Sequence, residues 1–328
     1  MKVFITRKIP RAGIDMLREH TKLELDYRQG APLSKEELIE GVKDADAIIP
    51  VIPDKIDREI LEAGKNLKVV AHYAVGYDNI DLKAASELGI YVTNTPGDLT
   101  EAVAEHSMAL LMAAGRRIVE ADKFTRQGEY DYWDPMIFLG PRFTEKTLGV
   151  IGFGRIGQHM ERIAKGGFDM RILYSDVKRN PKAEEEIGAI YTNLDGLLEE
   201  SDFISIHVPL LPSPKHLITS REIKKMKPTA YIVNTARGPV IDEDALSVAL
   251  EENWIAGAGI DVYEEEPHLY EGLKDLDNVI LTPHIGSATR EARIEMARMA
   301  ATNVIKTLID SKEPPNVVNR KIKNPRIE

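Results

Sequence analysis

The stretch GFGRIG, with glycines at positions 152, 154 and 157, limits the possible folds of this chain more than any other feature. It follows the apolar run TLGVI, which is typical of a buried strand, and a helical pattern begins inside it at Ile156. In such a G-x-G-x-x-G the glycines permit a tight turn, close approach of the backbone to a pyrophosphate, and close helix–strand packing. We therefore predict that Gly152, Gly154 and Gly157 bind a dinucleotide, with an ordinary strand–helix turn as the alternative.

The next predicted strand, MRILYSD, ends in an acidic residue at the expected place. Asp176 lies 19 residues after Gly157, and an acid about 20 residues beyond the motif accepts hydrogen bonds from the adenosine ribose. Its charge would repel a 2′-phosphate, so the predicted cofactor is NAD, with NADH preferred over NADPH. Lys178 and Arg179 could tolerate that phosphate, which leaves dual use possible.

Short apolar runs alternate with amphipathic helical patterns along most of the chain. Strands that are apolar on both faces are typical of parallel sheets covered by helices. The first ninety-odd residues form one predicted α/β unit, in which Ser34 and Glu37 make a capping box for a helix over 33–42. The predicted fold class is α/β, with two Rossmann-like, doubly wound parallel-sheet domains.

The second unit opens with one long predicted helix, from Thr100 to about Glu120. Its apolar face, which includes Val103 and Ser107, is interpreted as core packing. His106 is expected to pack or cap on this helix rather than to take part in catalysis. Six predicted strands follow, and a final helix is predicted over 289–310.

Composition excludes several classes of protein. The net charge is −10 and no basic stripe is present, so a nucleic-acid partner is not expected. The chain has no cysteine, which removes disulfides, thiol nucleophiles and thiolate metal sites from consideration. No run reaches the ~18 apolar residues of a membrane span, and no metal site is predicted. We expect a cytoplasmic protein that acts on a small molecule.

Three strands of the second unit end in residues suited to 2-oxo acid chemistry. Arg237 follows YIVNT, the acids Glu264–Glu266 follow IAGAGIDV, and His284 follows VILTP. Histidine exchanges protons near neutral pH, a carboxylate favours its protonated form, and arginine grips a carboxylate in bidentate fashion. Runs of acids are usually solvated surface, so these patterns alone leave open which glutamate would take part.

The motifs VIGFGRIG, NTARGPVID, AGAGIDVYEEEP and LTPHIGSAT resemble those of the D-isomer-specific 2-hydroxyacid dehydrogenases, and the similarity covers essentially the whole chain. The resemblance implies that Arg237, Glu266 and His284 are catalytic, with His284 as the proton donor. Glu264 and Glu265 are then expected to be solvated.

The resemblance also implies the binding residues. The backbone amides of Val75 and Gly76 are expected to hold the substrate carboxylate, which Arg237 would also bind. Besides the three glycines and Asp176, the implied cofactor site comprises Arg155, Ile156, Pro209, Thr235, Ala236, Asp261 and Ser287.

A discontinuous domain arrangement follows from the same resemblance. Residues 1–97 and 288–328 are expected to form a flavodoxin-like substrate domain, and 98–287 the NAD-binding Rossmann domain. A homodimer is expected, in which Trp133 either reaches the substrate site of the second subunit or packs on its own chain.

Within the family, KVFITRKIP, AVGYDNID and WDPMIFLG are most similar to glyoxylate/hydroxypyruvate reductases. The expected function is NAD(H)-dependent reduction of glyoxylate or hydroxypyruvate to the D-2-hydroxy acid. D-Lactate, 3-phosphoglycerate and phosphite are alternative substrates of the family, although Val75 replaces the lysine that phosphite dehydrogenases carry. The alternative outside the enzymes is an NAD-sensing binding module, like the corepressors that share this fold.

Overall fold

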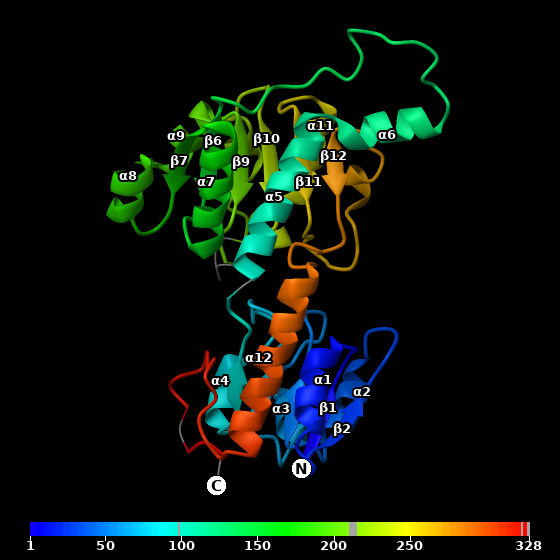
Figure 1. The fold of residues 1–328 in the computed structure, drawn as a ribbon, viewed down its shortest axis with the longest axis vertical. Helices are drawn as coiled ribbons and strands as arrows, with labels where there is room; N and C mark the ends of the chain where they lie inside the picture. The colour runs from blue at the N-terminus through cyan, green and yellow to red at the C-terminus, as the bar shows by residue number, and fades with distance from the viewer. Residues whose placement is uncertain (98, 210–214, 323, 327–328) are drawn as a thin grey trace. The chain divides into compact units, whose positions relative to one another are not determined.

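The computed structural model of the chain describes residues 1–97, 99–209, 215–322 and 324–326. It divides into two compact units (Figure 1). Unit 1 comprises Met1–Leu99 and Ala288–Glu328, and unit 2 comprises Thr100–Ser287. Residue 98, at the expected domain crossover, lies outside the described residues.

Unit 1 contains a five-stranded parallel sheet in the order β2-β1-β3-β4-β5. Its strands are short and mostly buried on both faces, as the apolar runs predict. Their bounds are β1 (Lys2–Ile5), β2 (Glu24–Tyr27), β3 (Ala47–Ile49), β4 (Val69–Ala71) and β5 (Tyr91–Thr93).

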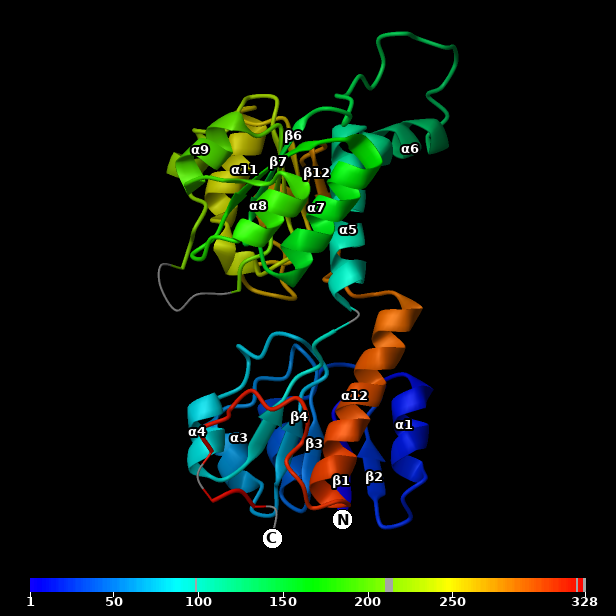
Figure 2. The same ribbon diagram turned by 60° about the vertical axis from the view of Figure 1, so that its left-hand side comes forward.

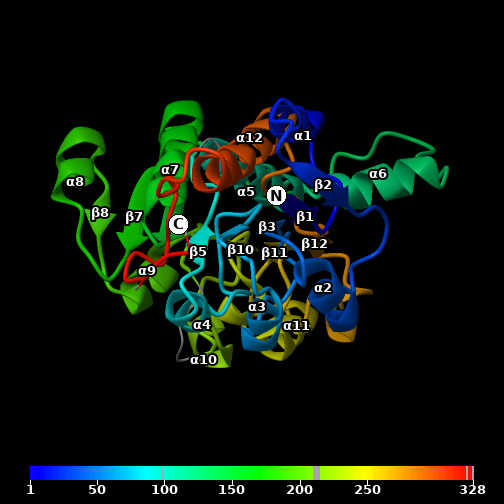
Figure 3. The ribbon, with the colours of Figure 1, turned by 90° about the horizontal axis from the view of Figure 1, so that it is seen from below.

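Helices cover both faces of this sheet. In Figure 3, α1 and α12 lie on one face and α2, α3 and α4 on the other. The capping box of Ser34 and Glu37 is confirmed at the start of α2. The bounds are α1 (Arg11–Arg18), α2 (Lys35–Val42), α3 (Arg58–Ala63), α4 (Leu82–Glu87) and α12 (Arg290–Leu308).

Unit 2 contains a seven-stranded parallel sheet in the order β12-β11-β10-β9-β6-β7-β8. The chain builds outward from β6 through β7 to β8, then returns to β9 and continues the other way. The order therefore reverses between β6 and β9, which is where open α/β sheets bind ligands. The bounds are β6 (Thr147–Ile151), β7 (Arg171–Ser175), β8 (Ile190–Tyr191), β9 (Phe203–Ile206), β10 (Tyr231–Asn234), β11 (Gly257–Ile260) and β12 (Val279–Leu281).

Two separate apolar cores cover the faces of this sheet. Figure 2 shows α9 and α11 on one face and α5 and α7 on the other, in agreement with the side chains of each core. The bounds are α5 (Leu99–Gly115), α6 (Ile118–Arg126), α7 (Arg155–Phe168), α8 (Pro181–Ile187), α9 (Leu194–Glu200), α10 (Ser220–Ile223) and α11 (Glu243–Glu251), with short 3₁₀ turns η1 (Gly238–Val240) and η2 (Glu271–Leu273).

The single long helix predicted from Thr100 to about Glu120 is wrong. Helix α5 ends at Gly115, and Arg117 adopts a left-handed backbone with φ of 52° before α6 begins. A Cβ on Gly140 would lie 2.0 Å from the Gly115 carbonyl oxygen, so the returning chain crosses directly over this helix end. The break thus coincides with a contact between distant residues and with Gly115, a residue type that disfavours the interior of a helix.

The segment that follows α5 extends away from the rest of unit 2 (Figure 1). We call α6 together with residues 127–142 the arm. Among the described residues of α6, none is fully buried. No helix in the described part of the chain is long and apolar enough to cross a membrane.

Candidate active site

The acidic loop after β11 and the loop after β12 bring two of the predicted catalytic residues together. Nδ1 of His284 lies 2.7 Å from Oε2 of Glu266, and both side chains are about one quarter exposed, at 25% and 30%. A carboxylate only accepts hydrogen bonds, so Nδ1 carries the proton of this bond. The other carboxylate oxygen of Glu266 accepts from the Tyr263 amide at 3.1 Å. Nε2 of His284 is thereby left for a ligand.

The backbone of His284 is held in an unusual conformation. Its φ is 54°, in the left-handed region that residues other than glycine rarely adopt. The His284 amide donates to the Asp261 carbonyl at 2.9 Å and to the Thr282 carbonyl at 3.0 Å. Backbone strain of this kind persists where surrounding bonds determine the geometry, and it is common at functional sites.

Asp261 secures the same loop through its buried carboxylate, which is only 1% exposed. It accepts from the amides of Ile285 and Gly286, each at 2.8 Å, and from the Thr282 hydroxyl at 2.6 Å. Burial alone would raise the pKa of Asp261, but hydrogen bonds from His106 and Thr282 outweigh it and hold the pKa below its usual value. The carboxylate therefore stays charged inside the fold.

Arg237 follows β10, and its loop packs against the acidic loop. The side chain of Asn234 braces this turn by donating to the Arg237 carbonyl at 2.9 Å and accepting from the Ala236 amide at 3.0 Å. At the next residue, a Cβ on Gly238 would lie 1.8 Å from the Tyr263 carbonyl carbon. Only glycine allows the two loops to approach so closely.

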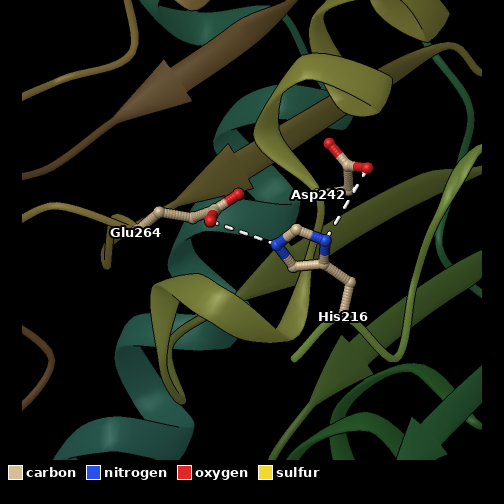
Figure 4. Close-up of side chains that lie close together, drawn as sticks. All are labelled: His216, Asp242 and Glu264. Carbon is tan, nitrogen blue, oxygen red and sulfur yellow. Dashed lines mark ion pairs between the residues drawn. The ribbon is translucent and has the colours of Figure 1, made fainter. Parts of the chain in front are cut away.

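The expectation that Glu264 is solvated is wrong, although Glu265 is exposed. The Glu264 side chain is 14% exposed and contacts the Lys215 ammonium and Nε2 of His216, the latter at 3.1 Å (Figure 4). Its amide donates to Glu243 at 3.0 Å. Burial raises the pKa of Glu264, but Lys215 and His216 outweigh it and lower the pKa overall. Glu264 thus anchors the acidic loop, and Glu266 extends from it.

The dinucleotide motif has the geometry that its glycines predict. Gly152 has φ of 88°, and a Cβ on Gly157 would lie 2.4 Å from the Gly152 carbonyl oxygen. At Gly154 a Cβ would meet no atom within 4 Å, so the backbone there is open to a ligand. Asp176 accepts from the Phe153 amide at 2.7 Å and lies beside this turn.

The remaining predicted cofactor residues also stand at the carboxyl edge of the seven-stranded sheet, because all its strands are parallel. Thr235 is 9% exposed and hydrogen-bonds Ser107 of α5 at 2.7 Å. The others follow β6, β9, β10 or β12 and are at least partly exposed: Arg155, Ile156, Pro209, Ala236 and Ser287. Residues 210–214, beyond Pro209, lie outside the described residues.

Val75 and Gly76 lie in unit 1, after β4. Neither amide donates a hydrogen bond within the described part of the chain. At the same edge of the sheet, after β1 and β3, Nε and Nη2 of Arg7 and Oδ1 of Asp54 are buried and have no hydrogen-bond partner among the described residues. Buried polar groups without partners are rare, so this edge of unit 1 offers hydrogen-bonding capacity to a ligand.

Two residues of α5 lie at the predicted cofactor site although the sequence did not place them there. His106 and Ser107 contact Asp261 and Thr235, two residues of the predicted cofactor site. Two adjacent polar residues on a helix that is otherwise largely apolar were the available signal. The predicted core packing of Ser107 is confirmed by its burial, and its hydroxyl also hydrogen-bonds Thr235.

Comparisons with known proteins agree with this geometry. Residues 108–286 match the family model for the NAD binding domain of D-isomer specific 2-hydroxyacid dehydrogenases. A glyoxylate reductase of Thermococcus litoralis is 52% identical over 98% of this chain and 97% of its own length.

Solved structures of similar proteins cover almost the whole chain. The TT0316 protein of Thermus thermophilus has a TM-score of 0.91 and 41% identity, over 97% of this chain and 100% of its own. An NADPH-dependent glyoxylate/hydroxypyruvate reductase of Sinorhizobium meliloti, solved with NADP and malonate, has a TM-score of 0.84 and 29% identity, over 98% of this chain and 97% of its own.

Proposed function

This chain belongs to the D-isomer specific 2-hydroxyacid dehydrogenase family, and from that premise we propose that it reduces glyoxylate or hydroxypyruvate to the 2-hydroxy acid. The product would be the D isomer where it is chiral. The observation that carries the proposal is the 2.7 Å contact of Glu266 with His284, at the sheet edge that also bears the dinucleotide motif. An acid–base pair and a nicotinamide site are what carbonyl reduction requires.

The residues of this chain would handle the proton and the negative charge. A reduced nicotinamide cofactor, held at the glycine motif, would supply the hydride for C2 of the oxo acid. Protonated His284 donates from Nε2 to the carbonyl oxygen, while Glu266 stabilises the charged imidazole through Nδ1. Arg237 would bind the substrate carboxylate and stabilise the charge that develops on the oxygen. Water then returns the proton to His284.

The glycine motif fits the diphosphate of a nicotinamide dinucleotide. Helix α7 has 14 residues and begins at Arg155 without a side-chain cap, so its first amides are available to an anion. The open backbone at Gly154 permits the approach of a phosphate. The residues that the sequence proposes for the cofactor site follow different strands of one sheet, and they share its carboxyl edge.

We propose that NADH is preferred over NADPH. Asp176 is placed beside the glycine turn, where its charge would oppose a ribose 2′-phosphate. Arg179, which could attract that phosphate, is bound through Nε and Nη2 to Glu184. Its guanidinium also holds the pKa of Glu184 down at about 2, so this pair persists at neutral pH. Lys178 is a further cation near this site, and its amide donates to Asp176 at 3.1 Å.

Replacing Asp176 by alanine should reduce the preference for NADH over NADPH. The variant removes the negative charge and an acceptor for the ribose, so KM for NADH should rise and KM for NADPH should fall. Loss of one hydrogen bond to a charged group corresponds to about tenfold in affinity. The measurement is kcat/KM with each cofactor at saturating glyoxylate. An unchanged ratio would remove Asp176 from the ribose site.

On the substrate side, we propose that the amides of Val75 and Gly76 bind the carboxylate of the oxo acid. Their hydrogen-bonding capacity is unused within the described part of the chain, and backbone N–H groups suit an anion. The unpartnered nitrogens of Arg7 add positive charge at the same edge of unit 1. This arrangement supports unit 1 as the substrate domain and unit 2 as the cofactor domain.

Turnover tests the proposed function. Purified protein is mixed with NADH and either glyoxylate, hydroxypyruvate, pyruvate or buffer alone, and NADH absorbance is followed. Oxidation of NADH that depends on glyoxylate or hydroxypyruvate is the expected result. NADH binding without oxidation by any 2-oxo acid would favour an NAD-sensing module, and faster turnover of pyruvate would favour a D-lactate dehydrogenase.

We also propose that the arm forms the interface of a homodimer. It carries the two most exposed aromatic side chains of unit 2, Tyr132 and Trp133, each 75% exposed. Met136, also in the arm, is 70% exposed. A hollow of about 640 Å³ lies beside the arm, between Leu139 and the amino ends of β10–β12. It is at the opposite sheet edge from His284, so it is not the active site. Clusters of exposed apolar side chains mark association surfaces, and a second copy would cover them.

Replacing both Tyr132 and Trp133 by glutamate should convert the dimer to a monomer, because two charges would be buried at the interface. Mass in solution, measured by light scattering, checks this. Val177→Glu is the matched control, since Val177 is 100% exposed and lies outside the arm. A monomeric wild-type chain, or a double variant that remains a dimer, would place the interface elsewhere.

A further inference from the structure

His106 lies beside the loop of His284 although it belongs to a different element. It is on α5, and its side chain is 18% exposed. Its Nε2 atom lies 3.3 Å from Oδ1 of Asp261 and 3.2 Å from the hydroxyl of Thr282. The contact therefore joins α5 to the ends of β11 and β12.

The donors and acceptors that are present determine the direction of these hydrogen bonds. The Asp261 carboxylate can only accept, and Thr282 donates its single hydroxyl proton to it at 2.6 Å. Nε2 of His106 therefore carries a proton, which it shares between the Thr282 oxygen at 3.2 Å and the Asp261 carboxylate at 3.3 Å. Asp261 thus receives donors from α5, from Thr282 and from the amides of Ile285 and Gly286.

Those two amides immediately follow His284, so the position of the Asp261 carboxylate sets the position of the catalytic loop. Its own carbonyl also accepts from the His284 amide. Two bonds join the loop to the Asp261 carboxylate, and two further contacts, from Thr282 and His106, hold that carboxylate in place. Removal of His106 would leave the buried carboxylate anchored by Thr282 alone on that side.

We propose that His106 is a positioning residue for the reaction: by donating from Nε2 to Asp261 it holds the loop that presents His284. This inference rests on the proposed proton-donor role of His284. Proton transfer depends steeply on the distance between donor and acceptor, and small displacements of a catalytic group reduce rate strongly. His106 itself touches neither the proposed substrate site nor the reacting atoms.

Three variants test this inference in the full-length protein. His106→Phe keeps a ring but removes the donor, and His106→Gln restores an N–H at about the reach of Nε2. His20→Phe, in unit 1, is the matched control for loss of a histidine. For each variant we would measure kcat, KM for glyoxylate, NADH affinity by fluorescence, and the amide hydrogen exchange of Ile285 and Gly286 without ligands.

The expected result for His106→Phe is a kcat about tenfold lower, faster exchange of the Ile285 and Gly286 amides, and a smaller loss of NADH affinity, since Asp261 also belongs to the proposed cofactor site. His106→Gln should recover most of both losses, and His20→Phe should behave as wild type. Wild-type kcat or unchanged exchange in His106→Phe would overturn the inference, as would equal loss in the Phe and Gln variants. Failure of the proposed function would be distinguishable from failure of this inference. In that case the wild-type protein would reduce no 2-oxo acid, and amide exchange would still show whether His106 holds the loop.

Discussion

Replacement of His284 by alanine should lower kcat for glyoxylate reduction by about 10²–10⁴-fold, the range typical of general acid catalysis. The variant removes the only proposed proton donor to the carbonyl oxygen. NADH affinity should stay close to wild type, because the described side-chain contact of His284 is to Glu266 and not to the glycine motif. Steady-state kinetics and NADH fluorescence titration measure the two quantities separately.

A matched control lies close by in the sequence. His268 is exposed and follows Glu266 by two residues, so His268→Ala makes the same substitution at the edge of the same loop. It should retain near wild-type kcat. If His284→Ala lost NADH binding together with turnover, or if both variants lost equal activity, His284 would not be the proton donor.

Replacement of Gly238 by alanine should damage both stability and activity. The added Cβ would lie 1.8 Å from the Tyr263 carbonyl carbon and 2.4 Å from the Glu264 amide nitrogen. These are backbone atoms, which cannot rotate away, so the Arg237 loop and the acidic loop would have to separate. Overpacking of this kind costs about 1–3 kcal/mol or more, which corresponds to a Tm lower by roughly 2–12 °C for a unit of this size.

The matched control for Gly238→Ala is Gly166→Ala on α7, where an added Cβ would meet nothing within 4 Å. Alanine is favoured over glycine inside a helix by about 1 kcal/mol, so this variant should be as stable as wild type or more so. Calorimetry and kcat measurements on both variants check the pair. A Gly238→Ala protein with wild-type Tm and kcat would show that the two loops are not packed as described.

The parts of the fold that could be predicted from sequence depend on neighbours along the chain. The strand–glycine–helix unit and Asp176 follow one another within β6, α7 and β7, so spacing alone placed them. The capping box of α2 is likewise local. The strand ends carrying Arg237, Glu266 and His284 could be placed at one edge because parallel strands share the direction of their carboxyl ends.

The features that could not be predicted from the sequence depend on contacts between residues that are distant along the chain. Gly140 meets Gly115 at the point where α5 ends, although the apolar helical pattern continues beyond it. Glu264 is held by Lys215 and Glu243, which no spacing rule connects to it. His106 reaches Asp261 from 155 positions earlier in the chain. In the sequence alone these residues look like ordinary surface or helix residues, because their contact partners are close only in the folded chain.

The most direct test of the proposed reaction is a crystal structure of the chain with NADH and oxamate, a 2-oxo acid analogue that cannot be reduced. We expect the amide carbonyl oxygen of oxamate, which takes the place of the 2-oxo oxygen, to lie within hydrogen-bond distance, about 2.6–3.2 Å, of Nε2 of His284, and its carboxylate to contact Arg237. Oxamate bound away from His284 while NADH occupies the glycine motif would contradict it.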